Sequence, residues 1–129
     1  QVGDCIPHDN VISFSFSGSY PPTSDRILTL CQVVAQESAH AFGLDHEYSF
    51  TDATAFGSDS ACNDPMTYRN DCGGEKFFRN VPANCGEYAV RTCKCGGAQN
   101  SHQKLLEVFG PGTSLIPPPT AMLFCTSQS

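Results

Sequence analysis

Residues 33–46, VVAQESAHAFGLDH, combine side chains that can bind a metal ion with one that can act as a base. In a helix, residues four apart lie on the same face, so the side chains of Gln36 and His40 can converge on one ion. Glu37 is adjacent to Gln36 and can reach a water molecule on that ion. The segment therefore predicts a metal site with a general base beside it.

The chain beyond this helix can supply a third ligand. Gly43 is well placed as the left-handed residue that ends the helix, and the chain can then turn back to present His46. Three protein ligands with an open fourth position are typical of a catalytic rather than a structural zinc site. We therefore expect zinc as the cofactor, held by Gln36, His40 and His46.

The segment Q-E-S-A-H-A-F-G-L-D-H resembles the H-E-x-x-H-x-x-G-x-x-H signature of the metzincin zinc peptidases at every fixed position except the first. Downstream, D-P-M-T-Y at residues 64–68 is similar to the methionine turn of that family. The tyrosine two residues after the methionine, and Glu47 after the last histidine, are astacin-like features. The resemblance implies that Met66 lies beneath the metal and that Tyr68 binds the metal or stabilises the oxyanion.

The resemblance implies a secreted zinc endopeptidase that cleaves a peptide or protein substrate. In such a mechanism, zinc polarises the scissile carbonyl, and Glu37 takes a proton from the activated water and passes it to the leaving amine. The loop around residues 69–84 is expected to form part of the wall of the pocket beyond the scissile bond.

Gln36 leaves an alternative open, since it replaces the histidine of the signature. It is either a ligand through its amide oxygen, which is a poorer zinc donor than imidazole, or a lost ligand. In the second case His8 or His102 is an alternative third ligand, although both are otherwise interpreted as surface residues. Asp45 and Glu47 are also interpreted as surface residues.

The rival function follows from the same substitution. A chain that has lost a zinc ligand can persist as a disulfide-stapled binding module on a metzincin scaffold, without metal or turnover. Zinc content distinguishes the two functions.

The length of 129 residues predicts one domain, and the net charge of −6 argues against nucleic acid or an anionic membrane as partner. The eight cysteines predict a disulfide framework made in an oxidising compartment, hence secretion. Local pairs are conceivable between Cys62 and Cys72, and between Cys85 and either Cys93 or Cys95. The start at Gln1 suggests a mature or excised product, so a missing N-terminal segment or propeptide is a further expected partner.

The elements that must position the site are predicted from hydrophobic periodicity and turn residues. Residues 11–17, VISFSFS, alternate strictly and predict a strand with one buried face. A helix over about 25–42, capped by Thr23 or Ser24, is apolar on nearly all sides and is expected to be buried. A second helix is predicted over about 101–109, and residues 47–98 are predicted to be loops.

Together with the resemblance, these elements predict an α+β fold, a reduced metzincin-like domain with a small sheet. Residues 1–46 would form its reduced upper part with the active-site helix. Residues 47–129 would form its loop-rich lower part, with the methionine turn and the C-terminal helix.

Overall fold

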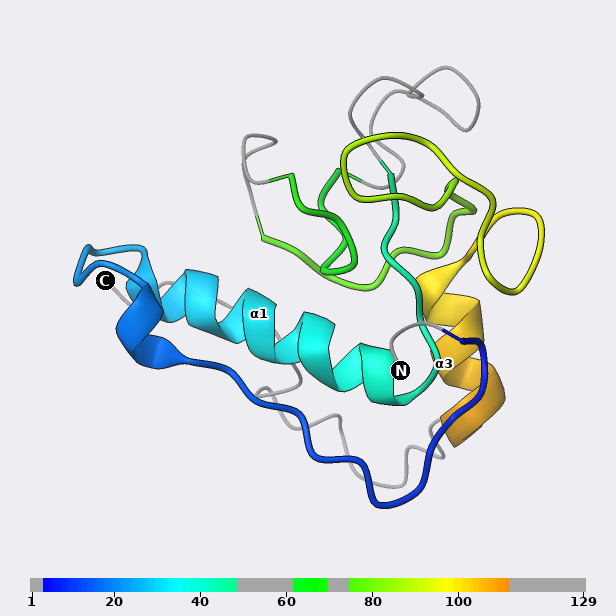
Figure 1. Ribbon diagram of the computed structural model, residues 1–129, viewed down its shortest axis with the longest axis horizontal. Helices are drawn as coiled ribbons and strands as arrows, with labels where there is room; N and C mark the ends of the chain where they lie inside the picture. The colour runs from blue at the N-terminus through cyan, green and yellow to red at the C-terminus, as the bar shows by residue number, and fades with distance from the viewer. Residues whose placement is uncertain (1–3, 49–61, 70–74, 112–129) are drawn as a thin grey trace.

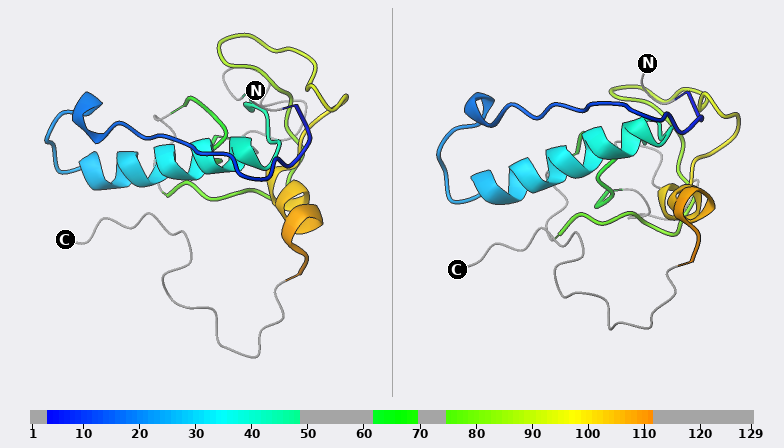
Figure 2. Two further views of the ribbon diagram at one scale, coloured as in Figure 1. Left: turned by 60° about the horizontal axis from the view of Figure 1, so that its bottom comes forward. Right: turned by 90° about the horizontal axis from the view of Figure 1, so that it is seen from below.

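The computed structural model of the protein describes residues 4–48, 62–69 and 75–111 (Figure 1). Within these ranges the regular elements are the 3-10 turn η1 (Ser17–Ser19) and two α-helices, α1 (Arg26–Ala41) and α3 (Ser101–Phe109). Figure 2 shows α3 crossing the C-terminal end of α1, with the segment that precedes η1 running alongside α1. The described part is therefore a small, mostly helical fold.

The predicted α+β architecture is wrong for this part of the chain. Residues 11–16 form no strand, and the β-pairing among the described residues is limited to three isolated antiparallel bridges between loops. Phe14 and Phe16 remain 67% and 71% exposed. An alternating pattern makes a strand only where a neighbouring chain accepts its backbone hydrogen bonds, and the described residues offer none there.

Helix α1 occupies the predicted range but is less buried than predicted. Its N-cap is Asp25 rather than Thr23 or Ser24, and no side chain caps it. Ile27 is 74% exposed and Val34 is 47% exposed, so the expectation of a helix buried on all sides is wrong. The buried residues of α1 all lie in its C-terminal half, because the described segments that pack against the helix lie there. These buried residues are Ala35, Ala39 and His40.

Gly43 ends α1 in a Schellman motif. The Leu44 N–H donates to the Ala39 carbonyl and the Gly43 N–H to the His40 carbonyl, at 3.2 and 3.0 Å. Gly43 has a φ of +89°, and a Cβ there would lie 2.7 Å from the backbone of Cys5. Only glycine fits this turn, which redirects the chain toward His46.

The core lies where α1, α3 and the turn at residues 64–67 meet. Ala39, Leu44 and Met66 are buried together, and Phe42, Phe78 and Leu105 pack against them. Helix α3 begins where the sequence predicts, because the Asn100 side chain accepts a hydrogen bond from the Gln103 N–H at 3.0 Å. This small core holds the C-terminal half of α1 and leaves its N-terminal half exposed.

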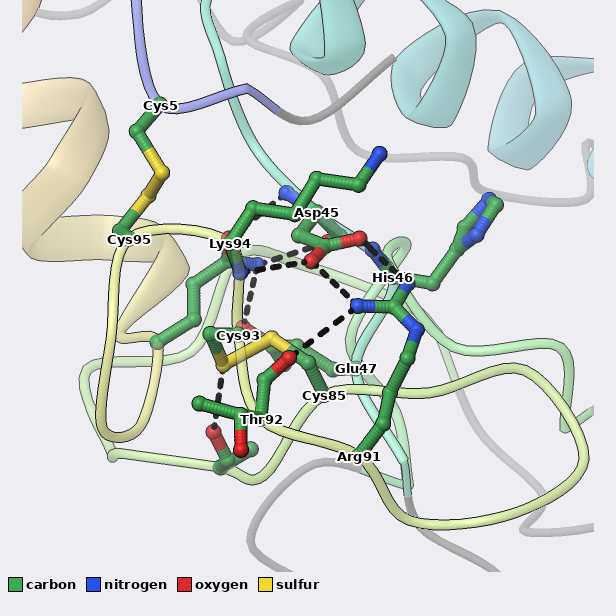
Figure 3. Close-up of a disulfide and its surroundings, with 12 residues drawn as sticks. Cys5, Asp45, His46, Glu47, Cys85, Arg91, Thr92, Cys93, Lys94 and Cys95 are labelled. Atoms are coloured by element: carbon green, nitrogen blue, oxygen red, sulfur yellow. Dashed lines mark hydrogen bonds and ion pairs between the residues drawn. A yellow bond between two sulfur atoms is a disulfide. The ribbon is translucent and has the colours of Figure 1, made fainter.

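Disulfides supplement this core. Cys5 pairs with Cys95 and Cys85 with Cys93, the latter being one of the two alternatives expected for Cys85 (Figure 3). Cys31 and Cys62 are disulfide-bonded as well, and no cysteine among the described residues is free. The suggested pair Cys62–Cys72 stays untested, because Cys72 lies outside the described residues. These disulfides indicate an oxidising compartment.

None of the helices in the described ranges is long and apolar enough to cross a membrane.

Candidate metal centre

The two motif histidines meet at the end of α1. His40 is in the last turn of the helix and His46 is in the loop after Gly43, and their Nε2 atoms lie 2.9 Å apart. The ring centroids are 4.5 Å apart with an interplanar angle of 86°. The Schellman turn thus brings together two residues that the sequence predicts as ligands of one ion.

The other ring nitrogen of each histidine is occupied. His40 Nδ1 lies 2.7 Å from the Leu44 carbonyl oxygen, and His46 Nδ1 lies 2.8 Å from Glu87 Oε1. Both partners are acceptors, so each Nδ1 must carry the hydrogen. In the neutral rings both Nε2 atoms are then bare acceptors that face each other. This arrangement requires a shared proton or a metal ion between them.

The separation of the Nε2 atoms is compatible with zinc. Two imidazole nitrogens bound to one zinc at about 2.0–2.1 Å lie roughly 3 to 3.5 Å apart in tetrahedral geometry. The observed 2.9 Å needs only a slight opening to reach that range. The two histidines therefore fit the metal that the sequence motif implies.

Burial favours the ligand form of His40. The residue is 6% exposed, and burial lowers the pKa of its imidazole. The nearby His46 lowers the pKa of His40 further, while the Leu44 carbonyl opposes the shift. Neutral imidazole is the form that binds metal, so His40 is available as a ligand at neutral pH.

Arg91 fixes the carboxylates behind His46. Its guanidinium donates to both carboxylate oxygens of Asp45, at 2.6 and 2.7 Å (Figure 3). It also donates to Glu87 Oε1 at 2.8 Å. Hydrogen bonds from Arg91 and then from His46 lower the pKa of Glu87 to about 2. Burial alone would raise the pKa of Asp45, but the bonds from Arg91 and from backbone N–H groups outweigh it and lower that pKa. Glu87 is therefore ionised and can accept a hydrogen bond from Nδ1 of His46.

Asp45, His46 and Glu87 also form a cluster that could hold a metal ion, since they offer ligand atoms within 4.8 Å of one another. Arg91 already bonds both carboxylates, so a cation there would have to displace a guanidinium. We therefore assign Asp45 and Glu87 to orienting His46. The second candidate place for a metal ion is the one where His46 Nε2 approaches His40 Nε2.

Glu37 and His40 both line a cavity of about 400 Å³. The opposite wall of this cavity is the segment of residues 11–14, which runs alongside α1 (Figure 2). Glu37 is partly exposed, so its carboxylate is accessible to water. The structure thus brings the predicted base and one predicted ligand into a single open cavity.

Gln36 is oriented by a different contact. Its side-chain Nε2 donates to the Pro65 carbonyl oxygen at 2.7 Å, which leaves Oε1 as the free acceptor of the amide. Gln36 lines a second cavity together with Tyr68 rather than the cavity of Glu37. Metal binding by Gln36 therefore stays a prediction.

The two alternative ligands occupy different places. His8 lines the cavity of Glu37 and His40, and its Nε2 lies 2.7 Å from Asp4 Oδ2. His102 lies in α3, and its backbone N–H donates to the Arg79 carbonyl at 3.3 Å. His8 is therefore the alternative ligand that shares the site.

Met66 and Tyr68 flank the histidines. Asp64 accepts a hydrogen bond from the Met66 N–H at 2.9 Å, which tightens the turn and places Met66, fully buried, against the end of α1. The Tyr68 ring lies 4.6 Å from the His46 ring, between centroids. Burial, and then the nearby Glu87, raise the pKa of Tyr68, so its phenol keeps its proton at neutral pH. It is therefore available as a hydrogen-bond donor.

The interpretation of Asp45 and Glu47 as surface residues is wrong. They are 1% and 2% exposed. Asp45 is buried because Arg91 and backbone N–H groups satisfy its charge. Glu47 accepts a hydrogen bond from the Gln99 side chain at 3.1 Å, while its second carboxylate oxygen is buried without a partner.

Glu87 and Arg91 were not predicted from the sequence. They lie 41 and 45 positions after His46 in a loop without periodicity. Their only signal is an acidic and a basic residue four apart between Cys85 and Cys93, in a loop that this disulfide closes. A charged pair inside a closed loop can serve as a rigid support for a neighbouring site.

The chain matches no protein-family model, no curated protein and no solved structure. The likeness to metzincins therefore rests on the motif residues themselves.

Proposed function

We propose that the chain is a secreted, zinc-dependent endopeptidase with metzincin-like chemistry. The observation that carries this proposal is the approach of the Nε2 atoms of His40 and His46 to 2.9 Å, with an acceptor beside each Nδ1 atom. His40 and His46 would hold the zinc, with the Gln36 amide oxygen as third ligand. When bound, zinc polarises the scissile carbonyl and lowers the pKa of a coordinated water.

The protein's own groups perform the proton transfers. Glu37 shares an open cavity with His40 and accepts the proton of the attacking water, then passes it to the leaving amine. Tyr68 is protonated and its ring lies beside that of His46, so its phenol would donate a hydrogen bond to the carbonyl oxygen as negative charge develops there. Glu87 keeps His46 in the required tautomer throughout.

Hydrolysis of unfolded protein substrates tests this proposal. Glu37→Gln keeps the size and hydrogen-bonding shape of the side chain but removes the base, so zinc should remain bound while hydrolysis falls about 100-fold or more. Glu107→Gln, on the exposed face of α3, is the matched control and should leave hydrolysis unchanged. Cleavage that survives Glu37→Gln unchanged would show that another site or a contaminant is responsible.

A disulfide-stapled binding module is the second candidate. The observation that favours it is the hydrogen bond from Gln36 to Pro65, which gives Gln36 a role without metal. Such a module predicts no zinc, no hydrolysis by the parent protein and no effect of Glu37→Gln on partner affinity.

A further inference from the structure

A second cavity, of about 320 Å³, adjoins the proposed metal centre through Gln36 and Tyr68. We call it the lysine cavity, because Lys76 is the only charged residue among the described residues of its lining. The other polar side chains carry phenols, amides and threonine hydroxyls that can donate hydrogen bonds, among them Tyr20, Gln32 and Tyr88. Within the part of the chain that the structure describes, no carboxylate belongs to this lining. A cavity with this composition favours an anion.

Among the described residues, Lys76 has no carboxylate as ion-pair partner, although a buried ammonium normally has one. It is 6% exposed, and its Nζ donates to the carbonyl and the hydroxyl oxygens of Thr67, at 2.9 and 3.4 Å. No ion pair joins it to a carboxylate within the described ranges. An ammonium has three N–H groups, so one remains for a ligand.

Asp64 acts electrostatically on Lys76 but forms no ion pair with it. Asp64 interacts with Lys76 only at a distance, since its oxygens accept hydrogen bonds from the backbone N–H groups of Met66 and Arg79 and from the Ser101 hydroxyl. Burial lowers the pKa of Lys76 to about 8, and Asp64 opposes that shift. At neutral pH the side chain is therefore mainly charged.

We propose that the lysine cavity binds a carboxylate of the peptide substrate through the ammonium of Lys76. This inference rests on the proposed peptidase function, because Gln36 and Tyr68 connect the cavity to the metal centre. A carboxylate there would supply the missing counter-charge of Lys76, and the phenols and amides would bind its second oxygen. The substrate class is thus a peptide that carries an acidic group next to the scissile bond.

Tyrosine fluorescence measures this binding without turnover. Three of the four tyrosines line the cavity and the chain has no tryptophan, so tyrosine emission reports on ligands there. The probes are N-acetyl-aspartate amide, its asparagine analogue, and N-acetyl-alanine with a free C-terminal carboxylate. We expect the better of the two carboxylate probes to bind about tenfold or more tightly than the asparagine analogue. The aspartate and alanine probes distinguish an acidic side chain from a chain terminus as the source.

Two variants test whether the preference for carboxylate probes depends on Lys76. Lys76→Met keeps the length of the side chain and should remove the preference for carboxylate over amide, whereas Lys104→Met in α3 should retain it. Equal binding of all three probes to the parent protein overturns the inference, and this comparison does not depend on the folding of any variant. A preference that persists in folded Lys76→Met overturns it as well.

Peptide cleavage separates this inference from the proposed function. Peptides that differ only by Asp or Asn next to the scissile bond should be cleaved with kcat/KM values about tenfold or more apart. Cleavage of both at equal rates overturns the carboxylate site and leaves the peptidase function intact. Absence of all cleavage, together with carboxylate binding that depends on Lys76, overturns the peptidase function and with it the substrate role of the carboxylate, but leaves the lysine cavity as a carboxylate-binding site.

Discussion

Glu87 Oε1 lies 2.8 Å from Nδ1 of His46, although the two residues are 41 positions apart. This contact fixes the tautomer of His46 and directs its Nε2 atom toward His40. The carboxylate is itself held by Arg91, which also bonds Asp45. The geometry of the proposed metal centre thus depends on a loop far from the motif in sequence.

Removing this support should weaken metal binding. Glu87→Ala leaves His46 Nδ1 without its acceptor, so zinc affinity in a chelator competition should fall about 10- to 100-fold. Glu107→Ala removes an exposed carboxylate from α3 and should leave affinity unchanged. Unaltered zinc binding in the Glu87 variant would show that His46 needs no orienting partner.

The third ligand can be identified by paired substitutions. If the Gln36 amide oxygen binds zinc, Gln36→His should tighten binding, because imidazole is the better donor, and Gln36→Leu should weaken it. His8→Ala should have little effect on zinc affinity, measured by the same chelator competition. Loss of zinc in His8→Ala, with no change in Gln36→Leu, would assign the third position to His8, which already lines the cavity.

Tyr68→Phe should slow turnover rather than weaken substrate binding. The phenol is placed beside His46 and is proposed to act only as charge develops on the carbonyl oxygen. Its loss should lower kcat roughly 100-fold, equivalent to about 3 kcal/mol, with little change in KM. A rise in KM at constant kcat would instead assign Tyr68 to ground-state binding of the substrate.

Stability should depend on pH through the buried carboxyl groups of Glu47 and Asp64. Burial, reinforced by the nearby Asp64, raises the pKa of Glu47 well above 4.5, and burial raises the pKa of Asp64 from 3.8 to about 6. A raised folded-state pKa means that ionisation costs more in the folded state. The stability that these two carboxyl groups contribute is therefore fully present below their pKa in the unfolded chain. It is lost as the pH rises through their pKa in the folded protein.

Glu47→Gln isolates this effect. The free energy of unfolding of the variant, relative to the parent protein, should increase as the pH rises from about 4 to 7. Carboxylates with lowered pKa values, such as Glu87, act in the opposite direction but are shared by both proteins and cancel in the comparison. A difference that stays constant with pH in urea titrations would show that Glu47 is ionised at no cost.

Sequence periodicity identified the helices because their signals are local. The bounds of α1 and α3 follow from an uninterrupted run before Gly43 and from the cap at Asn100. The expected strand over residues 11–17 failed because pairing is non-local, and an alternating pattern does not show that a partner exists. Glu87 was missed for a related reason, since the fold, rather than sequence proximity, brings it to His46.

All cysteines should be paired in disulfides, and the stability of the fold should depend on these bonds. The six described cysteines are all bonded, so thiol titration of the unfolded, unreduced chain should find essentially no free thiol. Cys85→Ser with Cys93→Ser should lower stability by about 2–4 kcal/mol and weaken zinc binding, because this disulfide closes the loop that carries Glu87. Several free thiols would contradict the assignment to an oxidising compartment.

The zinc content of the purified protein tests the central claim most directly. Elemental analysis after dialysis against buffer with micromolar zinc should find about one zinc per chain. His40→Ala and His46→Ala should each retain less than about a tenth of that amount, because each removes one of the two facing Nε2 atoms. A parent protein that carries no zinc and takes none up would contradict the metal centre, and with it the proposed peptidase.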